Sequence, residues 1–178
     1  MSRALVRDLV LACVTFALVA PAVALAEIWV GNDSDQTRIG TPTRDEYSGQ
    51  GGADHLEGRG GNDALKGQDG FDDLFGADDG GEYDYLSGGL GNDYAEGGLG
   101  DDRMYGDAGS DNLSGDDGYD LAIVGENGND TLRGGQANDH LYAFESDNND
   151  IDSVVDGGAG YDECTVNQND NWSNCVPM

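Results

Sequence analysis

Apolar residues recur along this chain at a nearly constant interval, each of them two positions after an aspartate. The aspartates follow one another mostly at steps of nine residues, and they are Asp45, Asp54, Asp63, Asp72, Asp84, Asp93, Asp102, Asp111, Asp120, Asp130, Asp139, Asp152 and Asp162. The residues two positions later are Tyr47, Leu56, Leu65, Leu74, Leu86, Ala95, Met104, Leu113, Ala122, Leu132, Leu141, Val154 and Cys164. Two series that stay in phase over about 120 residues indicate an array built from one short repeated unit.

Each unit joins a glycine-rich stretch to a short apolar one. Two successive copies read Gly88-Gly89-Leu90-Gly91-Asn92-Asp93-Tyr94-Ala95-Glu96 and Gly97-Gly98-Leu99-Gly100-Asp101-Asp102-Arg103-Met104-Tyr105. The first six residues are expected to turn tightly, because glycine reaches positive φ at little cost. The last three are expected to alternate outward, inward and outward as a strand does, so that one apolar side chain per unit faces the interior.

This alternation of turn and strand predicts an all-β fold, a parallel β-roll in which each turn carries the chain to the opposite sheet. Two units then complete one coil, and units of like parity stack at a strand spacing of roughly 4.8 Å. The predicted fold class is therefore a two-sheet β-solenoid of nonapeptide repeats with capped ends. This stacking places Asp54 over Asp72 and Asp93 over Asp111.

Stacked aspartates of this kind point to a bound cation. Carboxylates one strand spacing apart repel each other unless a positive charge lies between them. Calcium suits the gap, since it takes 6 to 8 oxygen ligands at about 2.3 to 2.6 Å in tolerant geometry, whereas magnesium needs a tighter octahedron. The sequence holds no cluster of cysteine and histidine, which argues against zinc. A lone aspartate in such a turn would instead bond its own backbone, but the regular copies favour ligation.

The repeated unit fits the pattern G-G-x-G-x-D-x-U-x, and by it the chain resembles the RTX, or hemolysin-type, calcium-binding nonapeptide repeat proteins. The resemblance covers residues 40–165. It implies several calcium ions, held between consecutive turns of the same side in two rows along the roll. The expected ligands are Asp54, Asp63, Asp72, Asp93, Asp102, Asp111, Asp120, Asp130 and Asp139, with Asp45 and Asp84 added from turns that fit the pattern less well.

Two units depart from the pattern in the middle of the array. Residues 76–78 lengthen one unit by three, and Glu82 then replaces the glycine expected before Asp84, so that this turn is not a standard site. Ala137 takes the same glycine position in a later unit, which is a milder departure. An extra Val124 predicts a bulge after Leu121-Ala122-Ile123.

The two ends of the array are expected to be caps, which solenoids need. Residues 27–39 form the N-terminal one, where Ile28-Trp29-Val30 reads as a strand that covers the open edge of the first coil. The repeats proper occupy residues 40–142. Residues 143–178 hold degenerate repeats and a C-terminal cap, because the glycines vanish between Ala143 and Asp156 although Asp152 and Val154 keep the phase.

Residues 1–26 read as a secretory signal. Arg3 and Arg7 precede an apolar run from Leu9 to Ala26, which ends on the small residues of Ala24-Leu25-Ala26. Cleavage after Ala26 is expected, and a retained membrane anchor is the alternative. The mature chain is thus expected to be secreted, extracellular and free of the membrane.

The cysteines agree with export. Removal of residues 1–26 would take away Cys13 and leave Cys164 and Cys175, an even pair in an oxidising compartment. A disulfide between them that closes the C-terminal end is expected, and two free thiols are the alternative.

Charge and composition narrow the choice of partners. The chain has 36 acidic and 8 basic residues, a formal net charge of −28 at pH 7. So acidic a surface argues for cations and against nucleic acid or anionic lipid. With 30 glycines and few apolar residues, composition alone would suggest disorder, whereas the periodicity predicts a fold that forms once calcium neutralises the carboxylates. A monomer is expected.

Catalysis is not expected from this sequence. It contains no HExxH, GxSxG or Walker motif, and His55 and His140 each follow a predicted ligand on an outward strand position, where a solvated side chain is the ordinary interpretation. The primary hypothesis is therefore a secreted calcium-binding protein that is not an enzyme. A fragment that accompanies a separate enzyme is a further alternative.

The aromatic outer face of one predicted sheet suggests another function, an extracellular adhesion or matrix module that binds polysaccharide or protein. The outward positions of this sheet include Tyr85, Tyr105, Leu121, Ile123 and Tyr142, while the other sheet offers Phe75 and Tyr94 among polar residues. Such aromatic side chains supply flat contact area. They are also common in strands for reasons of packing alone, which is the competing explanation.

Overall fold

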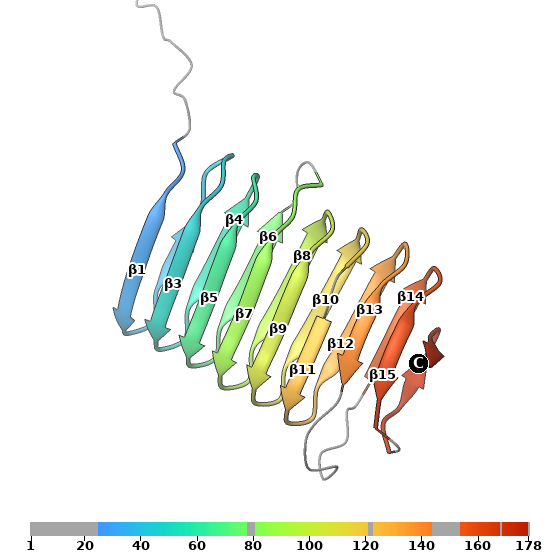
Figure 1. Cartoon of the computed structure of the whole chain (residues 1–178). Coiled ribbons are helices and arrows are strands. Elements are labelled where there is room, and N and C mark those ends of the chain that lie inside the picture. Colours follow the sequence, from blue (N-terminus) through green and yellow to red (C-terminus); the bar gives the residue numbers. More distant parts are fainter. Residues whose placement is uncertain (1–24, 78–80, 121–122, 144–153, 168, 178) are drawn as a thin grey trace, which may run out of the picture.

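The computed structural model describes residues 25–77, 81–120, 123–143, 154–167 and 169–177, and these residues form an all-β molecule (Figure 1). Odd-numbered strands make up one sheet and even-numbered strands the other. All paired strands are parallel, and each neighbour within a sheet lies two strands away in the sequence. The chain therefore changes sheet at every turn, and the predicted β-roll is confirmed.

The strands are short and evenly placed along the roll. The first sheet contains β1 (Ile28–Asp33), β3 (Glu46–Gly51), β5 (Ala64–Asp69), β7 (Tyr85–Leu90), β9 (Arg103–Ala108), β11 (Ile123–Asn127), β13 (His140–Ala143), β15 (Glu163–Val166) and β17 (Val176–Pro177). The second contains β2 (Thr37–Ile39), β4 (His55–Arg59), β6 (Asp73–Ala77), β8 (Tyr94–Leu99), β10 (Asn112–Asp117), β12 (Thr131–Gln136), β14 (Val154–Ala159) and β16 (Trp172–Ser173).

The strands are longer than the alternation of residues predicts. In the unit after Asp93, β8 continues through the glycine pair to Leu99, and only 100–102 turn before β9 begins. The prediction of six turning residues and three extended ones is wrong, because Gly98 still pairs with the neighbouring strands although its φ is 101°. The glycine pair is therefore part of the strand ladder. The reason why glycine is needed at these positions lies in the contacts of the turn.

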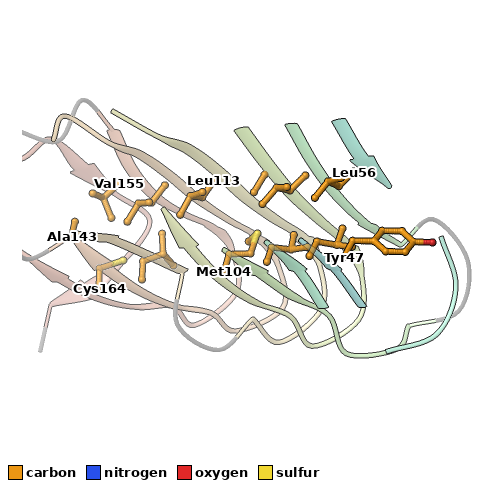
Figure 2. Packing of buried hydrophobic residues seen from close by; sticks show 13 residues of the cluster. Tyr47, Leu56, Met104, Leu113, Ala143, Val155 and Cys164 are labelled. Atoms are coloured by element: carbon orange, nitrogen blue, oxygen red, sulfur yellow. The ribbon is translucent and has the colours of Figure 1, made fainter. Parts of the chain in front are cut away.

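The core consists of two columns of side chains, one from each sheet, that meet between the sheets (Figure 2). Its members are at most 1% exposed, and they are Tyr47, Leu56, Leu65, Leu74, Leu86, Ala95, Met104, Leu113, Leu132, Leu141, Ala143, Val155 and Cys164. Apart from Ala143 and Val155, all of these are the inward residues that the phase predicts. The thin core agrees with the small apolar content of the chain.

Val155, not Val154, is the inward residue of β14. Val155 is fully buried and pairs in register with Leu132, whereas Val154 is only half-buried. The prediction for Val154 is therefore wrong, since without the glycine turn the strand register, and not the spacing from Asp152, decides which side chain faces inward. Asp152 itself lies outside the described residues.

The bulge predicted near Val124 is confirmed. The register between β9 and β11 shifts at Val124/Gly125 and again at Gly125/Asn127. The backbone of Ile123 pairs in register with Met104 of β9 and with Leu141 of β13. Leu121 and Ala122 lie outside the described residues.

The N-terminal strand covers the first coil as predicted. β1 pairs with β3, and the Trp29 ring meets the Tyr47 ring edge-on with 6.2 Å between centroids. Arg38 of β2 lies in register with Leu56, so that its guanidinium occupies the end of the core column and covers both rings, at 6.0 Å from Trp29 and 5.7 Å from Tyr47. A cation over aromatic faces closes the core here.

At the other end, β16 pairs with β14 and β17 pairs with β15. A disulfide joins Cys164 to Cys175 across a Cα separation of 5.6 Å, which confirms the expected pairing. The predicted signal segment lies almost entirely outside the described residues. Within the described part of the chain, no helix is long and apolar enough to span a membrane.

Candidate metal centre

The turns place the aspartates in two rows, one along each side of the roll. The first row contains Asp45, Asp63, Asp84, Asp102, Asp120, Asp139 and Asp162, and the second contains Asp54, Asp72, Asp93, Asp111 and Asp130. Each of these side chains is at most 3% exposed. The predicted stacking of Asp54 over Asp72 and of Asp93 over Asp111 is present.

Successive aspartates of a row are joined by a hydrogen bond. The backbone N–H of each one donates to Oδ1 of the aspartate one coil later, for example from Asp54 to Asp72 and from Asp93 to Asp111, both at 2.8 Å. The bond recurs along both rows at 2.6 to 3.0 Å. One carboxylate oxygen of each aspartate therefore holds its turn at a fixed distance from the turn one coil earlier.

The second carboxylate oxygen is buried and has no hydrogen-bond partner among the described residues. This is so for Asp54, Asp63, Asp72, Asp84, Asp93, Asp102, Asp111, Asp120, Asp139 and Asp162. A buried oxygen of a carboxylate without a donor costs free energy, since it loses its water and gains nothing in return. The same orphaned atom in turn after turn indicates that a cation belongs there.

Asp45 differs from the rest of its row. Its Oδ2 accepts a hydrogen bond from the Thr41 backbone N–H at 2.6 Å and another from the Thr41 hydroxyl at 3.1 Å. Both of its oxygens are therefore satisfied by the protein. Among the predicted ligands, Asp45 has the least need of a metal ion.

In most of the described turns, the glycine five positions before the aspartate is required by that aspartate, and at Asp84 this place is taken by Gly76. A Cβ added to Gly49 would lie less than 3.0 Å from Asp54 Oδ2, and one added to Gly88 would lie equally close to Asp93 Oδ2. No side chain fits there, because the carboxylate already occupies the space. This relation explains why a glycine inside a strand recurs at each unit.

Backbone carbonyls of the turns add further oxygens along each row. A Cβ on Gly70 would lie less than 3.0 Å from the carbonyl oxygen of Gly52, and Gly91 and Gly109 stand in the same relation to Gly70 and Gly91. The carbonyls thus point along the roll toward the next turn. Each row therefore offers only oxygen atoms, the carboxylate oxygens and the turn carbonyls, which are the ligands that calcium prefers.

Burial makes these carboxylates hard to ionise. It raises the pKa of Asp111 and of Asp120 from 3.8 to about 8, with a smaller rise from neighbouring carboxylates and an opposing effect of the backbone hydrogen bond. Burial likewise raises the pKa of Asp84 to about 7. At pH 7 and without a cation, Asp111 and Asp120 therefore favour the protonated form, and a cation would take the place of that proton.

In the turn with Glu82, the aspartate keeps the contacts that the other aspartates make. Asp84 Oδ1 accepts from Asp63 N–H at 2.7 Å, and its Oδ2 is orphaned. The Glu82 carbonyl oxygen faces Gly100 as the glycine carbonyls face their neighbours. Ala137, at the other departure, adopts a φ of 78°. Residues 78–80 of the insertion lie outside the described residues.

The metal-ligand groups are spread along the rows. Within the described ranges, no group of three or more histidine, cysteine, aspartate or glutamate side chains converges on one point. An ion would thus be held by aspartates of successive coils together with carbonyl oxygens. This donor set fits calcium, which tolerates irregular oxygen coordination, and offers no nitrogen or sulfur for zinc.

The rows extend further toward the N-terminus than the aspartates indicate. Glu27 N–H donates to Asp45 Oδ1 at 2.6 Å, and Gln36 N–H donates to Asp54 Oδ1 at 2.8 Å. Both residues stand in the position of the repeat aspartate, and Trp29 and Arg38 follow them in the inward position. Counting back from Asp45 by nine residues would have found them, but a search for aspartate passes over them.

Outside the turns, the second sheet carries a shallow groove of about 300 Å³ on its outer face. Its lining includes His55, Phe75, Glu57, Arg59, Glu96 and Asp116. The Phe75 ring lies 5.2 Å from the His55 ring and 5.8 Å from the Tyr94 ring, centroid to centroid. On the first sheet, Tyr85 and Tyr105 stack at 5.5 Å.

The histidines take outward positions as predicted. His55 forms part of the aromatic row just described, and its Nδ1 lies 3.9 Å from Asp73 Oδ2. His140 Nε2 shares a hydrogen bond of 2.6 Å with the Tyr119 hydroxyl, and its Nδ1 lies 3.5 Å from Glu163 Oε2. Neither residue joins the rows of aspartates.

A family model described as RTX calcium-binding nonapeptide repeat matches the chain in four copies, at residues 39–74, 48–81, 87–122 and 124–164. Together these segments cover about two thirds of the chain. No curated protein and no solved structure matches it significantly.

Proposed function

The chain belongs to the RTX calcium-binding nonapeptide repeat family, and from this premise we propose that it is a secreted protein that folds as calcium ions bind between its stacked turns. Calcium binding in a β-roll follows from the family. Secretion, dependence of the fold on calcium and the particular ligands are the further content of the proposal.

One observation carries it, the series of buried carboxylate oxygens without a partner along both rows. Bound calcium would supply positive charge and a shared coordination centre for these oxygens. Asp63 and Asp84 would hold an ion in the first row, and Asp72 and Asp93 one in the second, with turn carbonyls completing the shell. The glycines keep side chains out of the space that the carboxylates occupy.

The energetics favour coupling of folding to calcium. The core is thin, while most of the described turns bury an aspartate whose Oδ2 has no hydrogen-bond partner among the described residues. A site of this kind does not exist in the unfolded chain, so the free energy of calcium binding contributes directly to folding. We expect the chain to remain largely unfolded where calcium is scarce and to fold after export.

Export is supported by the signal-like residues 1–26 and by the Cys164–Cys175 disulfide, which suits an oxidising compartment. The proposal assigns the mature chain a binding role without catalysis, supported by the lack of a catalytic motif in the sequence. A monomer is part of the same proposal.

A far-ultraviolet circular dichroism titration tests the proposal. The mature chain should show little β structure in chelator and gain it as calcium rises toward millimolar concentration, the range typical of extracellular sites, about 10⁻⁴ to 10⁻³ M. Magnesium at the same concentration should not replace calcium. Full β structure in chelator would contradict calcium-driven folding. If the protein bound no calcium during the titration, the calcium sites themselves would be contradicted.

The groove on the second sheet favours a second candidate function, binding of an extracellular polysaccharide. Phe75 lines the groove together with Glu57 and Glu96, and the Tyr94 ring lies next to Phe75, with its hydroxyl donating to Glu96. The groove and its edge thus combine aromatic contact area with carboxylate acceptors. Co-sedimentation with insoluble cell-wall polysaccharide in saturating calcium tests this function. Replacement of Phe75 and Tyr94 by Ser should abolish retention, whereas replacement of Tyr85 and Tyr105 on the first sheet should not, and equal retention of both variants would contradict it.

A further inference from the structure

Gln36 stands at the head of the second row, one coil before Asp54. Its backbone N–H donates to Asp54 Oδ1 at 2.8 Å, the same bond that each later aspartate of the row makes to its successor. It lies before residue 39, where the matched repeats begin. The backbone of the array therefore includes Gln36, although its side chain departs from the motif.

The amide of Gln36 is oriented with its oxygen inward. Nε2 donates to the Asn32 carbonyl at 3.3 Å and to the Ser34 hydroxyl at 3.2 Å, which are acceptors and so require the nitrogen on that side. Oε1 faces the opposite way, is buried, and has no hydrogen-bond partner among the described residues. The side chain thus carries the same kind of orphaned oxygen as the aspartates.

This oxygen also occupies the same place as theirs. A Cβ added to Gly31 would lie less than 3.0 Å from Gln36 Oε1 and from the Gly49 carbonyl oxygen. A Cβ added to Gly49 would meet Asp54 Oδ2 and the Gly67 carbonyl oxygen in the same way. Gln36 Oε1 therefore corresponds, coil for coil, to the orphaned carboxylate oxygen of Asp54.

The head of the first row is built differently. Glu27 pairs with the Arg38 guanidinium and accepts a hydrogen bond from the Tyr47 hydroxyl at 3.0 Å. The next residue of that row, Asp45, is satisfied by Thr41. The protein itself supplies the positive charge and the donors at this end of the first row, whereas no described residue donates a hydrogen bond to Gln36 Oε1.

We propose that Gln36 is a neutral amide ligand of a terminal calcium ion, which it shares with Asp54 at the N-terminal end of the second row. The proposal rests on the proposed function, since it adds one site to that array. Calcium accepts amide carbonyl oxygens as ligands, and its affinity depends on how many charged ligands a site contains. With an amide in place of one carboxylate, this site should fill last and empty first.

The test uses chains in which Trp172 is replaced by Phe, so that Trp29 is the one remaining tryptophan. Trp29 is half-buried in β1 and packs against Tyr47, in the first coil of the roll. Because the terminal site would lie in the same coil, the fluorescence of Trp29 should report on its occupancy. Calorimetry of the same chains gives the number of calcium ions bound. The variants are Gln36→Leu, Gln36→Asp and, as a control, Gln136→Leu at an exposed glutamine whose amide donates to Asp117.

Gln36→Leu should bind one calcium ion fewer than its parent, while Gln136→Leu should bind the same number. Gln36→Asp restores the charge of the repeat and should lower the calcium midpoint of the Trp29 signal by roughly tenfold. An unchanged ion count in Gln36→Leu, or an unchanged midpoint in Gln36→Asp, would overturn the assignment and leave Gln36 a structural amide. A parent that binds no calcium would overturn the proposed function as well, so the two failures are distinguishable.

Discussion

At the scale of single residues, the glycine and the aspartate of a unit depend on each other. The aspartate Oδ2 lies against the glycine five positions earlier, and Oδ1 accepts a hydrogen bond from the backbone N–H of the aspartate one coil before. A side chain on that glycine would therefore displace the carboxylate. β3 holds a matched pair that separates this role from glycine content in general. A Cβ on Gly49 would lie less than 3.0 Å from Asp54 Oδ2, whereas a Cβ on Gly51 would meet its nearest atom, Asp33 Cα, at an ordinary 3.5 Å.

We therefore expect Gly49→Ala to destabilise the calcium-bound fold by about 1 to 3 kcal/mol, the usual cost of overpacking. Gly51→Ala on the same strand should change stability by less than about 0.5 kcal/mol. Urea unfolding in saturating calcium, followed by circular dichroism, measures both. Equal losses for the two variants would show that the carboxylate does not need the space above Gly49.

Protonation of the buried aspartates predicts an unusual pH dependence for the calcium-free chain. Burial raises the folded-state pKa of Asp111 and Asp120 from 3.8 to about 8, so the folded state binds protons more tightly than the unfolded state. The stability contributed by these groups is complete below about pH 4 and is lost as pH rises toward about 8. In chelator, β structure should therefore be greater at pH 5 than at pH 8.

Circular dichroism in chelator at several pH values measures this effect, and the double variant Asp111→Asn and Asp120→Asn serves as its control. Because asparagine does not titrate, the control should lose less β structure between pH 5 and pH 8 than the parent. In saturating calcium the order should reverse, since protons then compete with the ion for the same oxygens. Greater β structure at pH 8 than at pH 5 in chelator would contradict the raised pKa values.

At the scale of elements, the sequence pattern predicted the order of strands and most of the core, because the aspartate and the inward residue recur in one phase. The strands are longer than the pattern predicts, because glycine usually indicates a turn, whereas Gly97 and Gly98 remain in the β8 ladder. The pattern also favours Val154 over Val155, because spacing alone cannot reveal the register of a strand that lacks its glycine turn.

The aspartates of the candidate site could be predicted from the sequence, but the first residues of the two rows could not. Glu27 and Gln36 occupy the aspartate position by backbone hydrogen bonding, which a search for one residue type does not detect. The different needs of Asp45 and Asp54 were equally hidden. Asp45 is satisfied by Thr41, four residues before it, and only coordinates show that the Thr41 hydroxyl turns toward it.

The disulfide is predicted to act on the last strands and not on the array. It links β15 to Cys175, between the short strands β16 and β17, and encloses a separation of 11 residues. Removing a crosslink of this size costs roughly 3 kcal/mol in the chain-entropy treatment. Because β16 and β17 are only two residues each, this cost should appear as local opening of the C-terminal end.

Hydrogen exchange of the double variant Cys164→Ala and Cys175→Ala in saturating calcium tests this expectation. Amides of β15 and β17 should lose protection, whereas those of β5 to β10 should keep it. The single variant Cys175→Ala is the control, since it removes the disulfide but leaves the core residue Cys164 in place, and it should lose protection at the same strands. Loss of protection throughout the roll would show that the disulfide supports the whole fold.

At the scale of the whole molecule, the roll is a stack in which each coil pairs only with the coils before and after it. Its stability is then a sum of coil terms and contacts between neighbours, as in other solenoids. With a net charge of −28 and a core of two narrow columns, those contacts depend on what neutralises the rows. A lost ligand in the middle of a row should therefore weaken the contact between the coils on its two sides. The same loss at the end of a row should affect only the last coil.

Asp102 and Asp162 of the first row allow this difference to be measured. Both accept the N–H of the previous aspartate and both have an orphaned Oδ2, but Asp102 has aspartates on either side, whereas Asp162 ends the row among the described residues. Asparagine keeps the acceptor and removes the charge. Asp102→Asn should raise the calcium midpoint of the circular dichroism transition by about tenfold and make it less steep, because ions on both sides lose a shared ligand. Asp162→Asn should shift the midpoint by less than about twofold, and equal shifts in the two variants would mean that the coils bind calcium independently of one another.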